Sequence, residues 1–208
     1  MGYAPSLISG IMPRALEKFH ATAPRVRLEL SDLSPREMSA AASAGLLDLV
    51  LTAAGSEAAN PEFAWTELRR LAPMLVLSPE HPLAKLKKVP PARLRGVPML
   101  GLNRENFPEY AQRLRAVLKP FGVIPTLVAQ NADGLASLFA AIEAENGAAV
   151  LSEGVDGMLP RSLTSRPFSP ALAPTVVMAG LPAVRPSPHA ESFLRPLREE
   201  VALAKNRG

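Results

Sequence analysis

The chain has 208 residues, of which 48% are hydrophobic and 20% are charged, and its formal net charge is +4. This length allows one large domain or two small ones, and the apolar content excludes a disordered chain. The absence of cysteine excludes disulfides, thiolate metal sites and cysteine nucleophiles, and the modest net charge argues against a nucleic-acid platform.

The first fifty residues alternate between strand and helix patterns. A strand is expected to begin at residue 2 or 3, and a helix capped by Ser6 is expected to run to about His20. Residues 26–30 alternate between apolar and charged side chains, as in a strand with one wetter face, and residues 48–51 form a short buried strand. The order β-α-β-α-β favours a parallel sheet with right-handed crossovers.

The clearest local pattern marks the start of the helix between these last two strands. Ser34 can cap this helix, and Glu37 completes a capping box with it. Leu33 and Met38 are spaced to form the hydrophobic staple that accompanies such a start. Gly45 then provides a natural C-terminal stop.

A domain crossing is predicted after two further strands, at residues 63–71 and 74–77. Prolines and lysines interrupt the pattern between residues 78 and 91, and a second series of strands and helices follows. Ser152 can cap a brief helix within that series. The expected strands are 97–102, 124–129, 148–151, 162–168 and 175–179, and the expected helices are 106–118, 133–144 and 189–204.

Enzyme motifs are scarce in this sequence. His20, His81 and His189 have no metal-ligand spacing and are expected to lie on the surface. Glycine-rich phosphate loops and the GxSxG nucleophile motif do not occur. Asp48 can serve as a catalytic acid, but an Asp at the start of a strand more often caps a turn. A site with two paired carboxylates stays open as an alternative. We therefore predict no catalytic residue, no metal and no cofactor.

Small polar residues stand at the expected strand-to-helix turns. In open α/β sheets, ligands bind beyond the carboxyl ends of the strands. Hydroxyls, amides and free backbone N–H groups there suit a small anion such as a carboxylate, and Arg104 can add a guanidinium fork or be simply solvated. Each polar residue can instead be a helix cap, which is the more frequent role for Ser34 and Ser152. The residues concerned are Ser6, Ser31, Ser34, Asn103, Asn131 with Asp133, and Ser152.

Four segments carry a family resemblance through their order and spacing. They are GYAPSL at residues 2–7, GLLDLVL at residues 45–51, the strand from residue 73 with HPLA at residues 81–84, and GAAVL at residues 147–151. Together they resemble the effector-binding domain of LysR-type transcriptional regulators over nearly the whole chain. GLLDLVL corresponds to the family's G-x-L-D-L-x-I segment, and GAAVL to the strand after the long helix of its second lobe.

The resemblance implies an α/β fold of the type 2 periplasmic-binding-protein class, with two lobes joined by two crossing hinge strands. Lobe I is then expected to comprise residues 1–77 and 165–208, and lobe II residues 78–164. The crossings are expected near residues 77–79 and 164–168. The family's N-terminal winged helix-turn-helix is absent from these 208 residues, so the chain is expected to be a fragment that contacts DNA only through that missing segment.

The resemblance also implies a ligand-sensing role. A small, acidic effector is expected between the lobes, with a homodimer or tetramer formed through the helices near residues 8–19 and 106–118. A solute receptor or an enzyme on the same fold are the competing interpretations. Without a long apolar run or a secretory signal, the protein is expected in the cytoplasm and not in a membrane. The expected effector contacts are Ser6, Leu7, Ser31, Leu33, Asn103, Arg104, Asn131, Ala132 and Phe168, the last stacking on the effector or packing near the hinge.

Overall fold

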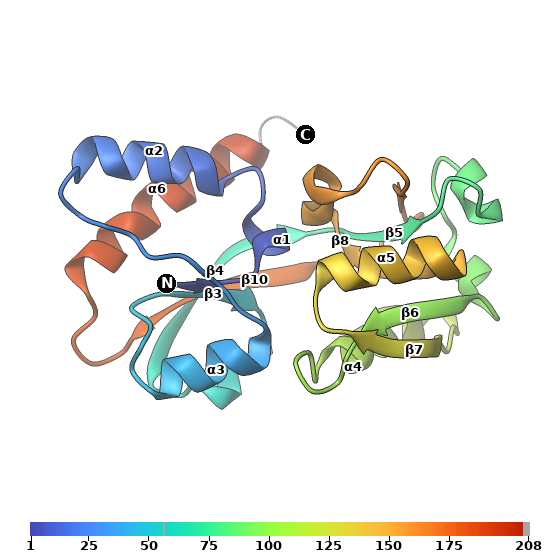
Figure 1. The fold of residues 1–208 in the computed structure, drawn as a ribbon, viewed down its shortest axis with the longest axis horizontal. Helices are drawn as coiled ribbons and strands as arrows, with labels where there is room; N and C mark the ends of the chain where they lie inside the picture. The colour runs from blue at the N-terminus through green and yellow to red at the C-terminus, as the bar shows by residue number, and fades with distance from the viewer. Residues whose placement is uncertain (56, 206–208) are drawn as a thin grey trace. The chain divides into compact units, whose positions relative to one another are not determined.

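The computed structural model describes residues 1–55 and 57–205 and divides the chain into two compact units. Unit 1 combines Met1–Arg70 with Val176–Gly208, and unit 2 is Leu71–Thr175. Each unit is built on its own five-stranded sheet (Figure 1). Among the described residues, no helix is long and apolar enough to cross a membrane.

The sheet of unit 1 has the strand order β2-β1-β3-β10-β4. Strands β1, β2 and β3 run parallel, as the alternating pattern predicts, and β10 is antiparallel to β3. The elements are β1 (Gly2–Tyr3), α1 (Pro5–Ile8), α2 (Met12–Thr22), β2 (Ser31–Asp32), α3 (Pro35–Ser43), β3 (Val50–Ala53), η1 (Glu57–Ala59), β4 (Phe63–Leu71), β10 (Thr175–Pro182) and α6 (Pro188–Lys205).

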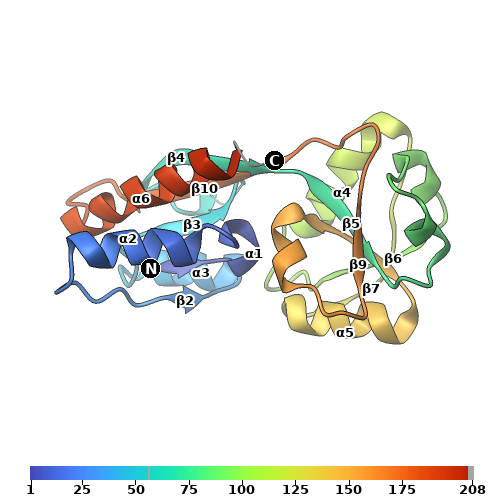
Figure 2. The same ribbon diagram turned by 90° about the horizontal axis from the view of Figure 1, so that it is seen from above.

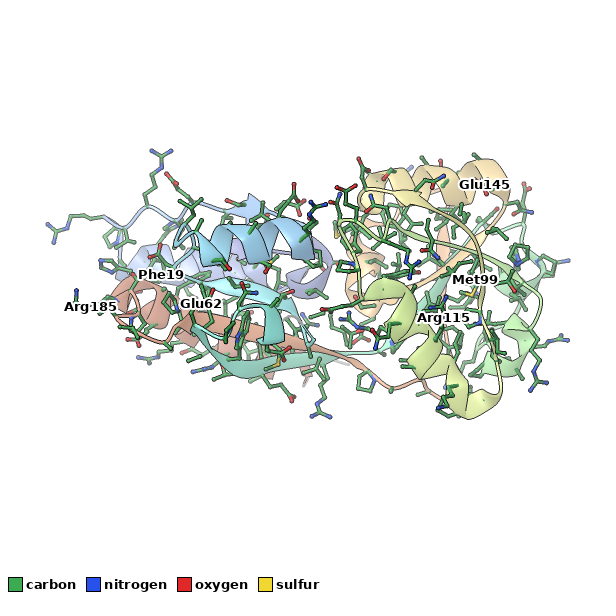
Figure 3. The ribbon with its side chains drawn as sticks, turned by 90° about the horizontal axis from the view of Figure 1, so that it is seen from below. Phe19, Glu62, Met99, Arg115, Glu145 and Arg185 are labelled. Atoms are coloured by element: carbon green, nitrogen blue, oxygen red, sulfur yellow. The ribbon has the colours of Figure 1, made fainter. Side chains whose placement is uncertain are left out.

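Helices α2 and α6 lie side by side in unit 1 (Figure 2). The ring of Phe19, labelled in Figure 3, meets that of Phe193 edge to face, with centroids 5.3 Å apart, and both rings are buried. At the border of this contact, Lys18 Nζ lies 2.8 Å from Oε1 of Glu200, a buried carboxylate. The two ends of the chain therefore share one apolar core.

The start of α3 has the predicted capping box. Ser34 Oγ accepts a hydrogen bond from the Glu37 backbone at 3.3 Å, and Glu37 Oε2 accepts one from the Ser34 backbone at 2.9 Å. Hydrogen bonds from the Ser34 hydroxyl and backbone lower the pKa of Glu37. The predicted staple is also confirmed, because Leu33 packs against the cluster that contains Met38.

Substituting Ser34 by Ala should lower the free energy of unfolding by about 1 kcal/mol, because it removes the cap from a backbone N–H group. In a chain of this size, that loss corresponds to a fall in Tm of roughly 2–4 °C. Differential scanning calorimetry of the two proteins measures it. An unchanged Tm would mean that water replaces the cap without cost.

Two expected elements of unit 1 differ most from the structure in their limits. The helix expected from Ser6 to about His20 is broken into α1 and α2, because Gly10 has a φ of 76°, outside the helical region. The strand expected at residues 26–30 forms only at Ser31–Asp32, since β1 offers just two partner residues. Gly45, in contrast, ends α3 as predicted, with a φ of 70°.

The sheet of unit 2 has the strand order β7-β6-β8-β5-β9. Strand β6 is parallel to β7 and β8, whereas β5 is antiparallel to β8 and β9. The elements are β5 (Pro73–Leu77), η2 (Pro82–Lys85), η3 (Pro91–Leu94), β6 (Pro98–Leu102), α4 (Tyr110–Leu118), η4 (Lys119–Phe121), β7 (Thr126–Ala132), α5 (Leu135–Glu145), β8 (Ala148–Ser152), η5 (Glu153–Met158) and β9 (Thr164–Pro167).

Helices α4 and α5 cover opposite faces of this sheet (Figure 1). Met99, labelled in Figure 3, packs in the apolar cluster on the α4 side. Its neighbour Leu100 packs in the cluster on the α5 side. The Tyr110 hydroxyl donates to the Val150 carbonyl at 3.2 Å, and burial raises the pKa of Tyr110. Asn146 ends α5 in the left-handed conformation, with a φ of 47°, where the sequence predicts a stop.

Strands β5 and β9 stand at the predicted crossings, and both belong to unit 2. Strand β5 pairs with β8 along its whole length, and β9 pairs with β5 from Thr164 to Pro167. These pairings place both strands inside unit 2, which comprises Leu71–Thr175, while the division of the chain into lobes at residues 78–164 stays a prediction. The chain therefore passes between the units near residues 70–71, at the end of β4, and near residues 175–176, at the start of β10.

Candidate functional site

The carboxyl ends of β6 and β7 lie side by side in unit 2. Leu102 is opposite Ala132 in the sheet, and the backbone N–H of Asn103 donates to the Ala132 carbonyl at 2.8 Å. The structure therefore brings together two turns that the sequence predicts as effector contacts. Ala132 itself is buried and uses its carbonyl in this bond, so its side chain belongs to the core.

The Asn103 side chain has one group engaged and one available. Its Oδ1 accepts a hydrogen bond from the Asn106 backbone at 2.8 Å, which closes the turn before α4. Its Nδ2 makes no hydrogen bond to any residue that the structure describes. The oxygen therefore stabilises a turn and does not cap α4, whose N-cap position is Glu109, while the amide nitrogen stays available to a ligand. Arg104 and Asn131 beside it are exposed.

The carboxyl ends of β1 and β2 meet in the same way in unit 1. Gly2 is opposite Ser31, and the Leu33 backbone donates to the Tyr3 carbonyl at 3.2 Å. Ser6 is not the helix cap that the sequence predicts, because Ala4 takes the N-cap position of α1. Within residues 1–55 and 57–205, neither the Ser6 nor the Ser31 hydroxyl has a hydrogen-bond partner, and both residues are half-buried.

Three predicted contact residues are packing residues in the structure. Leu7 is buried, with 8% of its surface exposed, and Leu33 packs in the staple at the start of α3. Phe168 is 6% exposed and lies in the apolar core of unit 2 together with Val89 and Leu172. Of the two roles expected for Phe168, the structure shows packing and gives no support to stacking on an effector.

Two polar residues at these strand ends were missed by the sequence interpretation. Asp32 ends β2, where desolvation, with a smaller contribution from the nearby charge of Glu37, raises its pKa. Gln130 lies in β7, and its Oε1 is buried without a hydrogen-bond partner among the described residues. A register shift between Leu100 and Leu102 places Gln130 there, and such a bulge has no clear sequence pattern.

The remaining predicted turn residues have local structural roles. Ser152 makes no side-chain cap at η5, contrary to prediction, whereas Asp133 Oδ1 accepts a hydrogen bond from Ser137 at 2.6 Å. His81 is half-buried, its Nδ1 accepts from the Leu83 backbone at 3.1 Å, and desolvation lowers its pKa. In the described part of the chain, no group of three or more His, Cys, Asp or Glu residues is placed to hold a metal ion.

Comparison with known proteins bears on both the family and the fold. The family profile described as LysR substrate binding domain matches residues 1–202. No curated protein matches the chain in sequence. Among solved structures, the chain is similar to the BenM effector binding domain with its effector benzoate, at 19% identity and a TM-score of 0.81. The match covers 98% of this chain and 91% of that chain.

Two further solved structures are similar over most of the chain. One is the reduced form of the OxyR regulatory domain from Pseudomonas aeruginosa, at 17% identity and a TM-score of 0.74, covering 95% of both chains. The other is full-length CbnR complexed with the target DNA, at 14% identity and a TM-score of 0.79, covering 96% of this chain and 69% of that chain. At these identities the likeness concerns the fold, and the predicted fold class is confirmed.

Proposed function

The chain belongs to the LysR substrate-binding domain family, and on that premise we propose that it binds a small acidic effector through the polar strand ends of both units. As a member, it is the effector-binding regulatory domain of a LysR-type regulator and not an enzyme. Membership of this family also argues against the alternative of a solute receptor. The similar BenM domain was solved with benzoate, which is a carboxylate.

Four side-chain donors without a partner support this proposal. They are the hydroxyls of Ser6 and Ser31 in unit 1, and Nδ2 of Asn103 with the guanidinium of Arg104 in unit 2; within the described residues none of them makes a hydrogen bond. A carboxylate accepts several hydrogen bonds, and those from charged groups are the strongest. We place the carboxylate of the effector at Asn103 and Arg104, because Asp32 adds a like charge at the strand ends of unit 1.

An effector that contacts both units would act by selecting among arrangements of the units. It can shift the population only by its differential affinity for the arrangement in which both sets of donors reach it. In this proposal, binding energy from Ser6 and Ser31 on one unit and Asn103 on the other supplies that difference. A change in the arrangement of the units would alter the contacts between copies of the chain, and through them the regulation of transcription.

Self-association through edge strands is the second part of the proposal. Strand β2 is at one edge of the first sheet, and β7 is at one edge of the second. Next to and on β7, Ile124 and Val128 expose 84% and 55% of their surfaces, which favours pairing with another copy in a dimer or tetramer. The exposed faces of α2 and α4 would contribute to this contact. We place DNA binding in a segment outside these 208 residues, and the regulator in the cytoplasm with the DNA.

Replacing Val128 by Lys should shift the chain toward the monomer, because a charge on an edge strand opposes pairing with another copy. Sedimentation velocity at several protein concentrations measures the association. Leu46, which exposes 73% of its surface in unit 1, offers a matched control, and Leu46→Lys should leave the association unchanged. Equal association of wild type and Val128→Lys would remove β7 from the proposed interface.

The effector class can be identified with a thermal-shift screen of the purified chain against small carboxylic acids, including benzoate. A ligand present at about 100 times its Kd stabilises the folded state by about 2.7 kcal/mol. At this chain length, that corresponds to a rise in Tm of roughly 5–10 °C. A saturable rise with one class of acid supports the proposal, and a rise only with cationic or uncharged compounds would contradict an acidic effector.

Ser6→Ala and Ser31→Ala should each weaken effector binding roughly 10-fold, since each variant leaves one ligand oxygen without a donor, at a cost of about 1–3 kcal/mol. Isothermal titration calorimetry with the acid found in the screen measures the Kd. Ser34→Ala is the matched control, because its hydroxyl is used in the capping box and its loss should change stability but not affinity. Unchanged affinity in both test variants would remove the unit 1 contacts.

A further inference from the structure

A hollow of about 300 Å³ opens on unit 2 between η2 and strand β9. It is lined by residues 84–87 and 165–167, all within unit 2. Strand β9 forms one edge of the sheet, whereas β7, which carries Asn131, forms the other edge. The hollow is therefore distinct from the strand ends to which the acidic effector is assigned.

Arg166 is held in place at this hollow by three hydrogen bonds. Its Nε donates to the Ala84 carbonyl at 2.9 Å, and its Nη1 donates to the Ser165 carbonyl at 2.7 Å and to Thr164 Oγ1 at 2.6 Å. Its Nη2 makes no hydrogen bond within the part of the chain that the structure describes. The guanidinium plane is thus oriented in advance, with one nitrogen left to donate.

The lining of the hollow carries positive charge that no acidic group offsets. Lys85 and Lys87 line it and are exposed, and neither they nor Arg166 form an ion pair with any described residue. The two segments that build the hollow also contain no Asp or Glu over long stretches, from residue 81 to 104 and from 157 to 190. Three cationic residues therefore line one hollow, and none of them has a described ion-pair partner.

We propose that this hollow binds a phosphate group, either free or carried by a small organic molecule. The free Nη2 of the Arg166 guanidinium can donate to a phosphate oxygen, and lysine ammonium groups bind phosphate as point charges. A dianion is favoured over a monocarboxylate because three of the lining residues are cationic. The volume of the hollow lies at the lower end of the range for small-molecule sites, so it leaves space for a small organic part beside the phosphate.

The test is a calorimetric titration of the 208-residue chain with inorganic phosphate and, separately, with glycerol 3-phosphate, at low and matched ionic strength. We expect saturable binding with a Kd in the millimolar range or below. Lys85→Gln and Lys87→Gln should each weaken it roughly three- to tenfold, as expected for one charge contact. Lys119→Gln, an exposed lysine of η4 outside the hollow, is the control and should bind as the wild type does.

The arms of the experiment separate the two sources of phosphate. Tighter binding of the ester supports a phosphorylated small molecule, and equal binding supports free phosphate.

Arg166→Lys should also weaken binding, with its Tm recorded to show that the chain is folded. Asn103→Asp should bind phosphate as before, so the result does not depend on the effector proposal. Failure of both probes to saturate, or equal weakening by Lys119→Gln, would overturn the assignment.

Discussion

Replacing Asn103 by Asp is expected to weaken binding of a carboxylate effector roughly 100-fold or more, since like charges brought together at a binding site cost several kcal/mol. The substitution keeps Oδ1, which accepts the hydrogen bond from the Asn106 backbone, so the turn before α4 should stay intact. It replaces only Nδ2, the donor without a partner in the described structure, with an anionic oxygen. Calorimetric titration with the acid identified by thermal shift measures the loss.

A matched control distinguishes local repulsion from a change in net charge. Gln112→Glu adds the same charge at an exposed position on α4. It should leave the Kd within about twofold, because a charge in contact with solvent is screened by water and salt. If Asn103→Asp bound the effector like the wild type, or if Gln112→Glu weakened it equally, the effector carboxylate would not lie at Asn103.

Replacing Phe193 by Ala should lower the free energy of unfolding by about 3–5 kcal/mol, the usual cost of removing a buried aromatic ring. The ring of Phe193 is fully buried, and it meets Phe19 edge to face in the contact between α6 and α2. The corresponding fall in Tm is roughly 6–20 °C for a chain of this size.

The single tryptophan makes this measurement specific to unit 1. Trp65 lies in β4, with its ring against Gly180 of β10, so its fluorescence reports on the unfolding of unit 1. Urea unfolding followed by this signal should shift in Phe193→Ala and much less in Phe121→Ala, a half-buried ring of unit 2. If the urea midpoint shifted as much in Phe121→Ala as in Phe193→Ala, the two units would unfold as one.

Local chemistry made much of the fold predictable. The capping box at Ser34, the stop at Gly45 and the end of α5 at Asn146 depend on residues within a few positions of one another, so the sequence contains the whole interaction. The alternation of strands and helices likewise predicted the parallel pairing of β1 and β2. The limits of β2 depended instead on the length of its partner, which no local pattern reports.

The candidate site was less predictable because a hydroxyl or an amide can have two roles. The sequence identifies Ser6, Ser31, Ser34 and Asn103 as polar turn residues, but the hydrogen bonds in the structure divide them. Ser34 is used in a cap, Ser6 and Ser31 are not, and Asn103 uses only its oxygen. Gln130 was missed because its position depends on a bulge that arises only when β7 pairs with β6.

The discontinuity of unit 1 sets the order in which this protein can fold during its synthesis. Unit 2 is one continuous segment and can fold as soon as it leaves the ribosome, but the apolar face of α2 stays uncovered until α6 has been made. At 5–20 residues per second, the delay is roughly 10–35 s. Over that interval the nascent chain exposes Phe19 to its surroundings, so the yield of folded protein should respond to chaperone supply and to any truncation within α6.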